Sequence, residues 1–247
     1  MLIAPGGSLG GARPKASVVD PEGRLWIAKF PSIRDDIDVG AWEMVVQTLA
    51  RACGLHVPDA LARRFSGEHH TFLVRRFDRT PVGRRLHFAS AMNLTARQDG
   101  DDADAGASYL DIAQVLMTSG ATPDADLREL WSRIVFNVLV SNTDDHLRNH
   151  GFLLVPGRGW MLSPAFDMNP VHAAHGLKLN ISEVDNALDL DLVRSVAPYF
   201  RVSTVDAEAI IARQRQVVAR WRMIAGALGI PAREQMRMAD AFGRAPR

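Results

Sequence analysis

The sequence predicts an α+β protein with two lobes, a small β-rich lobe over residues 1–95 and a larger, mostly helical lobe over residues 96–247. Two observations predict this division. In the first part, short runs of β-branched and aromatic residues alternate with turns around a single helical pattern. In the second part, apolar residues recur mainly at the three- and four-residue spacing of amphipathic helices.

The first lobe is expected to contain two β-hairpins with a helix between them. The runs ASVVD and RLWIAKF, within residues 16–30, flank the turn PEG and predict the first hairpin. Residues 35–54 follow with a helical pattern that Gly54 ends. The runs ALARRF and TFLVRRFDR then predict a second pair of strands, so the lobe reads as hairpin, helix, hairpin.

The second lobe is expected to consist mainly of helices. After the polar loop TARQDGDDADAG, the segments SYLDIAQVLMTSG and PDADLRELWSRIVFNVLVSN predict two helices, of which the second is longer and mostly buried. GFLLV and WMLS predict two short strands around the turn PGRG, and LKLNI also has a strand-like pattern. The tail returns to helices through VDAEAIIARQRQVVARWRMIAGALG and PAREQMRMADAF. Ligands commonly bind between two such lobes.

Composition excludes several classes of function. With 47% hydrophobic and 23% charged residues and a formal charge of +1, the chain is typical of globular proteins and shows no sign of direct nucleic-acid or membrane binding. The single cysteine, Cys53, excludes an internal disulfide and a multi-cysteine metal site. Its apolar neighbours predict a buried thiol, which fits a reducing cytoplasm. No signal peptide is recognised, and no run reaches the ~18–20 apolar residues of a bilayer span.

A glycine-rich segment precedes the first predicted strand. Four glycines occur within the six residues GGSLGG, and ARPKA follows them. Glycines let backbone N–H groups approach phosphate oxygens closely. The segment lacks the Lys-Ser or Lys-Thr pair of the GxxxxGK[ST] loop, so a flexible linker remains an alternative interpretation.

Lys29 ends the apolar run RLWIAKF, where a charged ammonium is costly unless it meets an anion. Glu43, in the following predicted helix, can supply a carboxylate, and nucleotide phosphates could supply further negative charge. Kinases use a strand lysine paired with a helix glutamate to orient the phosphates of ATP. The alternative is that Lys29 only extends its ammonium to water at a strand edge.

The stretch SNTDDHLRNHGFLL places Asp144 and Asn149 five residues apart, which is the spacing of the catalytic aspartate and metal-binding asparagine in kinases. Such an aspartate orients the substrate hydroxyl and accepts its proton, and the amide oxygen binds magnesium without adding charge. Asp167 follows the predicted strand pair and can supply a second protein ligand for magnesium. Asp167-Met168-Asn169 stands where kinases have Asp-Phe-Gly. The order of these motifs predicts phosphoryl transfer from a nucleotide.

Other chemistries fit less well. Asp145, His146 and His150 could bind a transition metal, but they lack the HExxH helix spacing. No G-x-S-x-G elbow indicates a serine hydrolase. We expect Asp145 to cap a turn, and we expect His146 to hold the loop by hydrogen bonds or to contact a phosphate.

The sequence resembles the HipA family of bacterial serine/threonine kinases, the toxins of HipBA-type toxin–antitoxin modules. The resemblance runs from Ser8 to about Phe242 and rests on motifs in the same order: SLGGARPKA, WIAKFPS, the glutamate of WEMVVQTLARACGL, VRRFDR, NTDDHLRNH and SPAFDMNP. It implies a protein-kinase-like fold with ATP and Mg²⁺ as cofactors. Family members commonly carry a further N-terminal subdomain before the phosphate loop, and this sequence does not show it.

The resemblance implies which residues bind the nucleotide. The phosphate loop would consist of Gly10, Gly11, Ala12 and Lys15. Lys29 would contact the ATP phosphates and pair with Glu43. Arg75 and Phe77 would hold the adenine through backbone groups of the hinge.

The resemblance also implies the catalytic set. Asp144 would be the catalytic aspartate, His146 an active-site helper, and Asn149 and Asp167 the magnesium ligands. Ser8 matches the serine that such kinases phosphorylate on themselves. A phosphoserine, with a charge of about −1.5 to −2, cannot share a site with ATP phosphates and would silence the enzyme.

The implied function is ATP-dependent phosphorylation of a cytoplasmic protein on serine or threonine. Aminoacyl-tRNA synthetases are targets in the family, although no residue here names a target. A HipB-like antitoxin and, through it, operator DNA are the implied partners. A nucleotide-binding pseudokinase or antitoxin-docking scaffold and a small-molecule phosphotransferase remain alternatives, and the full set of Lys29, Asp144, Asn149 and Asp167 argues against a scaffold.

Overall fold

The computed structural model describes residues 2–4, 13–65, 67–80 and 82–244, and every structural statement below concerns these residues. The β-rich part is a five-stranded antiparallel sheet with the order β1-β2-β3-β5-β4. Its strands are β1 (Leu2–Ala4), β2 (Lys15–Val19), β3 (Leu25–Lys29), β4 (Ala60–Arg63) and β5 (Thr71–Arg75). Both hairpins predicted in this region are therefore confirmed.

The β2–β3 hairpin is closed by a side chain as well as by its turn. The Asp20 carboxylate accepts hydrogen bonds from the backbone N–H of Arg24 and from Nε1 of Trp26, and Gly23 adopts a φ of 81°. In the resulting register Lys15 lies directly opposite Lys29. Directly opposed residues share a face of the sheet. Two lysines therefore leave the same end of this hairpin on the same face.

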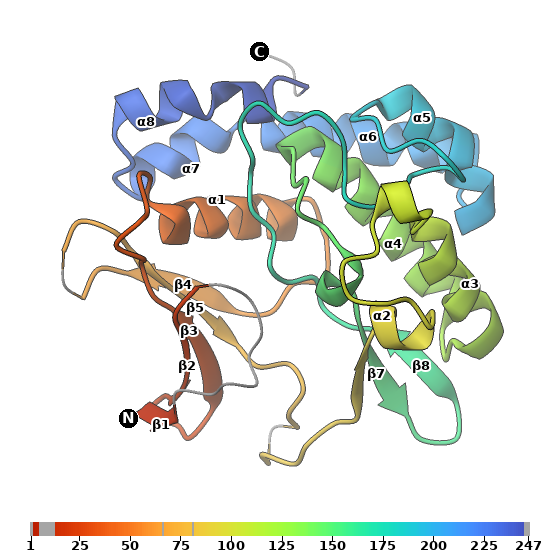
Figure 1. Ribbon diagram of the computed structural model, residues 1–247, viewed down its shortest axis with the longest axis horizontal. Helices are drawn as coiled ribbons and strands as arrows, with labels where there is room; N and C mark the ends of the chain where they lie inside the picture. The colour runs from red at the N-terminus through yellow and green to blue at the C-terminus, as the bar shows by residue number, and fades with distance from the viewer. Residues whose placement is uncertain (1, 5–12, 66, 81, 245–247) are drawn as a thin grey trace.

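Helix α1 (Val39–Ala52) follows β3 and confirms the predicted helix, although it begins four residues later than expected. The later start has a local cause, because the Asp38 side chain accepts a hydrogen bond from the Ala41 N–H and so caps the helix at that point. Gly54, with a φ of 81°, follows the C-terminal end. Figure 1 shows α1 lying between the five-stranded sheet and the C-terminal helices.

The helical part is assembled around α4 (Pro123–Val140), which is buried over most of its length. Proline at its first position fits the start of a helix. The surrounding helices are α3 (Tyr109–Ser119), α5 (Leu190–Val196), α6 (Thr204–Val218), α7 (Trp221–Ala227) and α8 (Ala232–Arg237). A single apolar core runs from α1 through α3 and α4 to α6 and α7. Among the described residues, no helix is both long and apolar enough to cross a membrane.

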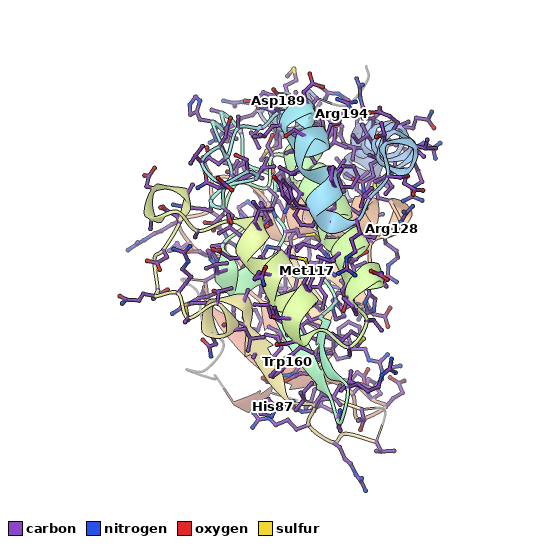
Figure 2. The ribbon with its side chains drawn as sticks, turned by 90° about the vertical axis from the view of Figure 1, so that its right-hand side faces the viewer. His87, Met117, Arg128, Trp160, Asp189 and Arg194 are labelled. Carbon is purple, nitrogen blue, oxygen red and sulfur yellow. The ribbon has the colours of Figure 1, made fainter. Side chains whose placement is uncertain are left out.

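Figure 2 views this part from the side of α3, whose outer face carries the partly exposed Met117. Arg128 of α4 and Arg194 of α5 lie above it in this view. Below α3 the rings of His87 and Trp160 meet edge to face, with centroids 5.5 Å apart. This contact joins the chain before β6 to strand β8.

A second, three-stranded antiparallel sheet has the order β6-β7-β8 and consists of β6 (Phe88–Ser90), β7 (Gly151–Val155) and β8 (Gly159–Leu162). The predicted strands GFLLV and WMLS are confirmed as β7 and β8. Strand β6 leads into the short helix α2 (Ala91–Leu94). Because β6 precedes residue 95 and pairs with β7, this sheet crosses the predicted lobe boundary, which itself stays a prediction.

One expectation for the second part needs correction. The strand predicted for LKLNI does not form; residues 177–181 make only isolated bridges, and the N–H groups of Lys178 and Asn180 bond to the carbonyls of Thr143 and Ala107 in loops. Leu177, Leu179, Asn180 and Ile181 are buried by packing between loops instead of by pairing in a sheet. In the tail, the helical run divides at Ala219 and Arg220 into α6 and α7. Helix α5 was not predicted.

Candidate active site

A cleft of about 440 Å³ opens between β3, β5 and α1 on one side and the segments 146–149 and 166–167 on the other. Most of the residues predicted to bind the nucleotide or metal line it: Lys15, Lys29, Glu43, Arg75, Phe77, His146, Asn149 and Asp167. A larger surface groove of about 760 Å³ runs beside Ile33 and Phe65, and none of the residues predicted to act in the site lines it. The predicted site residues therefore gather in the smaller cleft.

Lys29 is the centre of the cleft. Its ammonium donates to Oε1 of Glu43 and to Oδ1 of Asp167, each at 2.5 Å, and the residue is only 9% exposed. Glu43 is 4% exposed. The lysine therefore turns into the cleft and meets two carboxylates, one from the helix that follows its strand and one from a segment 138 residues later.

Charge balance keeps this group ionised. Burial disfavours the charged form of Lys29 and so lowers its pKa, but the carboxylates of Glu43 and Asp167 together have the larger effect and raise this pKa above its ordinary value. Burial also works against the carboxylate of Asp167, yet the positive charges of Lys29 and Lys15 lower its pKa. Burial raises the pKa of Glu43, and Lys29 only partly offsets it. The cleft thus holds a cationic lysine beside an anionic Asp167.

The backbone at Asp167 is held in an uncommon conformation. Its φ is 60°, in the left-handed region that residues other than glycine seldom adopt. The flanking residues fix it, because Met168 is buried and the N–H of Asn169 donates to Oδ1 of Asn142 at 3.0 Å. This conformation directs the carboxylate at Lys29. Asn169, which replaces the glycine of kinases, therefore takes part in holding the segment.

The loop that carries Asp144 and Asn149 leaves the end of α4, where Ser141 adopts a left-handed φ of 51°. Asn149 ends a short 3₁₀ turn (Leu147–Asn149) and lines the cleft; its Nδ2 donates to the carbonyl of Asp144 at 3.1 Å, which leaves Oδ1 available to a cation. His146 also lines the cleft, and within the described part of the chain its Nδ1 is buried without a hydrogen-bond partner. Asp144 is exposed on the same loop and is not part of the cleft wall.

Asn149 and Asp167 form a suitable donor set for magnesium. Both face the cleft, and together they offer one amide oxygen and one carboxylate. Magnesium prefers oxygen ligands and often takes only one or two from the protein, with phosphates and water completing its shell. The residues present therefore fit the metal.

Contrary to the prediction from the sequence, Asp145 does not cap a turn. It is 3% exposed, and its Oδ2 accepts hydrogen bonds from Tyr109 Oη at 2.6 Å, Asn137 Nδ2 at 2.7 Å and His150 Nε2 at 2.8 Å. Burial disfavours its carboxylate, but His150 and Tyr109 together lower its pKa. Sequence reasoning missed this group, although Asn137, a polar residue inside the apolar run IVFNVLV, was a visible signal.

Part of the cleft wall is aromatic. Phe77 lies 5.5 Å from Phe166 and 6.1 Å from Phe88, measured between ring centroids, and all three residues line the cleft. Aromatic rings are suitable surfaces for a planar base. Phe88 and Phe166 were not singled out from the sequence. Arg75, predicted for the hinge, lines the cleft and contacts Asp59 at 3.4 Å.

Four predicted residues, Gly10, Gly11, Ala12 and Ser8, lie outside the residues that the structure describes. The nearest described position, Arg13, forms an ion pair with Asp35 in the connection between β3 and α1. Lys15 follows in β2 and reaches the cleft.

The fold and the cleft define a kinase-like protein, and the comparisons agree. The chain belongs to the HipA-like C-terminal domain family, whose pattern matches residues 7–221. A curated Sinorhizobium fredii protein, named "Putative kinase Y4dM", is 30% identical over 219 residues, which are 82% of this chain and 52% of the relative. The chain spans between 39% and 52% of the length of the three curated relatives considered.

Two solved structures share the fold. HipA of Shewanella oneidensis MR-1, solved with HipB and operator DNA, superposes with a TM-score of 0.73 at 17% identity, covering 96% of this chain and 64% of that one. The proinflammatory kinase CtkA of Helicobacter pylori superposes with a TM-score of 0.61 at 14% identity, covering 94% of each chain. The two superpositions show that the small β-rich part and the larger helical part are arranged as in these two proteins.

Proposed function

We propose that the chain is an ATP- and magnesium-dependent protein serine/threonine kinase. The observation that carries this proposal is the ammonium of Lys29, held 2.5 Å from both Glu43 and Asp167 in a cleft that Asn149 also lines. A lysine tied to a helix glutamate beside a metal-binding acid is the arrangement with which kinases orient nucleotide phosphates.

The nucleotide would lie along the cleft with its phosphates toward the two lysines. Lys15 and Lys29 leave adjacent strands side by side, so both can contact phosphate oxygens. The base would pack against Phe77 and Phe88, with backbone groups at Arg75 and Phe77 as its hydrogen-bond partners. The carboxylates of Glu43 and Asp167 raise the pKa of the buried Lys29 against the effect of burial, so phosphate binding requires no change in the protonation of Lys29.

Asn149 through Oδ1 and Asp167 through its carboxylate would hold magnesium, which supplies charge neutralisation for the phosphates when it is bound. Asp144 would accept the proton of the substrate hydroxyl. Its exposure fits this role, because a serine or threonine on another protein must reach it from outside. His146 lines the cleft, from which its ring would contact a phosphate oxygen.

Other parts of the proposal rest on the family. Gly10, Gly11 and Ala12 would complete the phosphate loop, and Ser8 would be the autophosphorylated residue. The substrate would be a cytoplasmic protein, with aminoacyl-tRNA synthetases as the first candidates. A HipB-like antitoxin, and operator DNA through it, would be partners, as in the complex in which the Shewanella protein was solved.

Transfer of labelled γ-phosphate to the chain itself and to lysate proteins tests the proposal. Asp144→Asn should reduce transfer by roughly 100- to 10,000-fold, the range that a positioned acid–base group contributes. Asp104→Asn, at another exposed aspartate, should leave transfer unchanged. Mapping of the labelled residue then decides whether Ser8 is the site of autophosphorylation.

The outcomes separate the alternatives. Equal labelling by wild type and Asp144→Asn removes Asp144 from the mechanism. Binding of ATP without any transfer indicates the pseudokinase or scaffold. Labelling of sugars or aminoglycosides in the absence of protein labelling indicates a small-molecule phosphotransferase.

A further inference from the structure

The first turn of α1 is bonded to a helix almost 200 residues away in the chain. Oε1 of Glu234, in α8, accepts hydrogen bonds from the backbone N–H of Asp38 at 2.9 Å and from Nε1 of Trp42 at 2.7 Å. Asp38 caps α1, and Trp42 lies one residue before Glu43. One carboxylate oxygen of the C-terminal region therefore holds two donors at the start of the helix that carries Glu43.

Trp42 is fixed by stacking as well. The indole is 1% exposed and lies 5.9 Å from Trp221 and 6.1 Å from Phe242, and these two rings stack on each other at 4.5 Å with an interplanar angle of 13°. All three aromatic residues belong to different elements, α1, α7 and the last 3₁₀ turn (Ala239–Phe242). Figure 1 shows α7 and α8 lying along α1 on the side away from the sheet.

The opposite side of the same turn is pressed against the sheet. Oδ1 of Asp38 accepts hydrogen bonds from the N–H of Ala41 at 3.1 Å and from the N–H of His70 at 2.8 Å. A Cβ added at Gly40 would lie 2.2 Å from the carbonyl oxygen of His70, so no side chain fits there. The first turn of α1 is thus held between the start of β5 and the C-terminal helices.

We propose that Glu234 is a positioning residue for the Lys29–Glu43 pair, which makes the C-terminal helix α8 part of the nucleotide site without contacting it. This inference rests on the proposed function and deepens it. A helix moves as a unit over one turn, so fixing the Asp38 and Trp42 donors fixes the direction of Glu43. Without Glu234, the buried indole N–H of Trp42 loses its hydrogen-bond acceptor. A shift of the first turn of α1 that brings this N–H to another acceptor then lowers the free energy of the variant.

The displaced arrangement has a defined consequence. If α1 shifts, Lys29 keeps Asp167 as its nearest carboxylate and loses Glu43. Lys29 would then neutralise the residue that is proposed to bind magnesium. Weaker binding of Mg–ATP follows, although neither Glu234 nor Trp42 touches the cleft.

Four variants test the inference. Glu234→Ala removes the acceptor, and Glu234→Gln keeps a carbonyl oxygen for both donors. Trp42→Phe removes one donor and keeps an aromatic ring in the stack. Arg233→Ala, at the exposed neighbouring position of α8, is the matched control. The dissociation constant for Mg–ATP and amide hydrogen exchange of residues 39–46 are measured on the full chain.

Glu234→Ala should weaken Mg–ATP binding by roughly 2- to 30-fold, the range seen when a residue outside a site modulates it. Glu234→Gln and Arg233→Ala should stay within about twofold of wild type. In a Glu43→Gln background, Glu234→Ala should cause no further loss, because its effect passes through Glu43. A merely structural role would instead give the same loss in both backgrounds, and that result would overturn the inference.

Hydrogen exchange separates this inference from the proposed function. Glu234→Ala should speed exchange in the first turns of α1 and leave α4 unchanged. If wild type binds no Mg–ATP, the proposed function is wrong. Independently of that result, unchanged hydrogen exchange in Glu234→Ala would overturn the positioning role. If Glu234→Ala does not fold, Trp42→Phe takes its place. This variant should bind Mg–ATP more weakly, with a smaller loss than expected for Glu234→Ala, and should exchange amide hydrogens faster in α1. If neither change is seen, the inference is contradicted.

Discussion

Two polar clusters of the molecule differ in how their charges are satisfied. The cleft cluster, Lys29, Glu43 and Asp167, places one ammonium between two carboxylates beside an open cavity. The support cluster, Tyr109, Asn137, Asp145 and His150, surrounds one carboxylate with three donors in the core. The side chain of Asp167 is 34% exposed, whereas that of Asp145 is 5% exposed.

This difference separates binding from support. The cleft cluster keeps one more carboxylate than ammonium, and Asp167 and Asn149 keep oxygen atoms toward the cavity, which suits a cation and a polyphosphate. In the support cluster, by contrast, Oδ2 of Asp145 already has three donors, and Asp145 does not line the cleft. A buried oxygen with three donors restrains the residues that donate to it. We infer that the support cluster holds the loop on which Asp144 and Asn149 are presented.

The largest expected effect comes from removing the carboxylate at the centre of the support cluster. Asp145→Ala leaves the three donors on Tyr109, Asn137 and His150 buried without their acceptor, and should lower the free energy of unfolding by about 3–5 kcal/mol. For a chain of this length the midpoint of thermal unfolding should fall by roughly 6–20 °C. Thermal melts followed by circular dichroism measure this shift.

The adjacent aspartate supplies the control. Asp144 is exposed, so Asp144→Ala should change the unfolding free energy by no more than about 0.5 kcal/mol while abolishing phosphoryl transfer. If both variants unfolded at the same temperature, the distinction between the two clusters would be lost.

Asp167→Asn should have the next largest effect, on activity. The substitution keeps the shape of the side chain and removes the charge proposed for magnesium, so phosphoryl transfer should fall by roughly 100- to 1,000-fold. Lys29 retains Glu43, and the unfolding free energy should therefore change by no more than about 1 kcal/mol. Parallel transfer assays and melts of Asp167→Asn and Asp104→Asn check this, and a melting shift as large as that of Asp145→Ala would contradict it.

Lowering the pH should reduce the stability of the folded protein mainly through the support cluster. The pKa of Asp145 is below its ordinary value of 3.8, because contacts with His150 and Tyr109 outweigh the effect of burial. A carboxyl group with a depressed folded-state pKa contributes stability above its unfolded-state pKa and loses it as the pH falls through the folded value. In the cleft cluster the shifts oppose each other, since burial raises the pKa of Glu43 and Lys29 lowers that of Asp167.

Urea unfolding from about pH 5 to about pH 3 measures this dependence. Wild type should lose stability over this interval, and Asp145→Asn, which has no carboxyl group to protonate, should lose less. An acid dependence that Asp145→Asn leaves unchanged would assign the effect to other carboxylates.

The two clusters also differ in how far the sequence predicts them. The order of Lys29, Glu43, Asn149 and Asp167 indicated the cleft, because nucleotide binding requires these residue types on successive elements. The support cluster has no such pattern: Tyr109 lies 36 residues from Asp145, and only packing of α3 on α4 brings them together. Glu234 is missed for the same reason.

The fold shows the same limit. Local periodicity predicted both hairpins of the first sheet, α1, α3 and α4, since each satisfies its own backbone and buries one face. It failed at residues 177–181, where Leu177, Leu179 and Ile181 alternate with polar residues in the sequence and are buried without forming a strand. Such an alternation fits any extended segment, and the sequence does not say whether another strand lies beside it. The roles of the site residues likewise stay predictions until variants are measured.

The smallest effect should come from removing one donor of the support cluster. Tyr109→Phe deletes the hydroxyl that donates to Asp145 and keeps the ring, whose edge-to-face contact with His150 has a centroid distance of 5.6 Å. Hydrogen bonds to charged groups contribute about 1.5–3 kcal/mol, so the melting midpoint should fall by roughly 3–12 °C. Asp145 keeps Asn137 and His150 as donors, which is why the loss should be smaller than that of Asp145→Ala.

The second tyrosine of the chain makes the comparison direct. Tyr199 is 59% exposed, and Tyr199→Phe should change the unfolding free energy by no more than about 0.5 kcal/mol. Tyr109→Phe should also leave phosphoryl transfer nearly intact, because two donors still hold the loop. If it reduced transfer as strongly as Asp167→Asn at a temperature where the protein is folded, the support cluster would take part in the chemistry, and the separation between binding and support would fail.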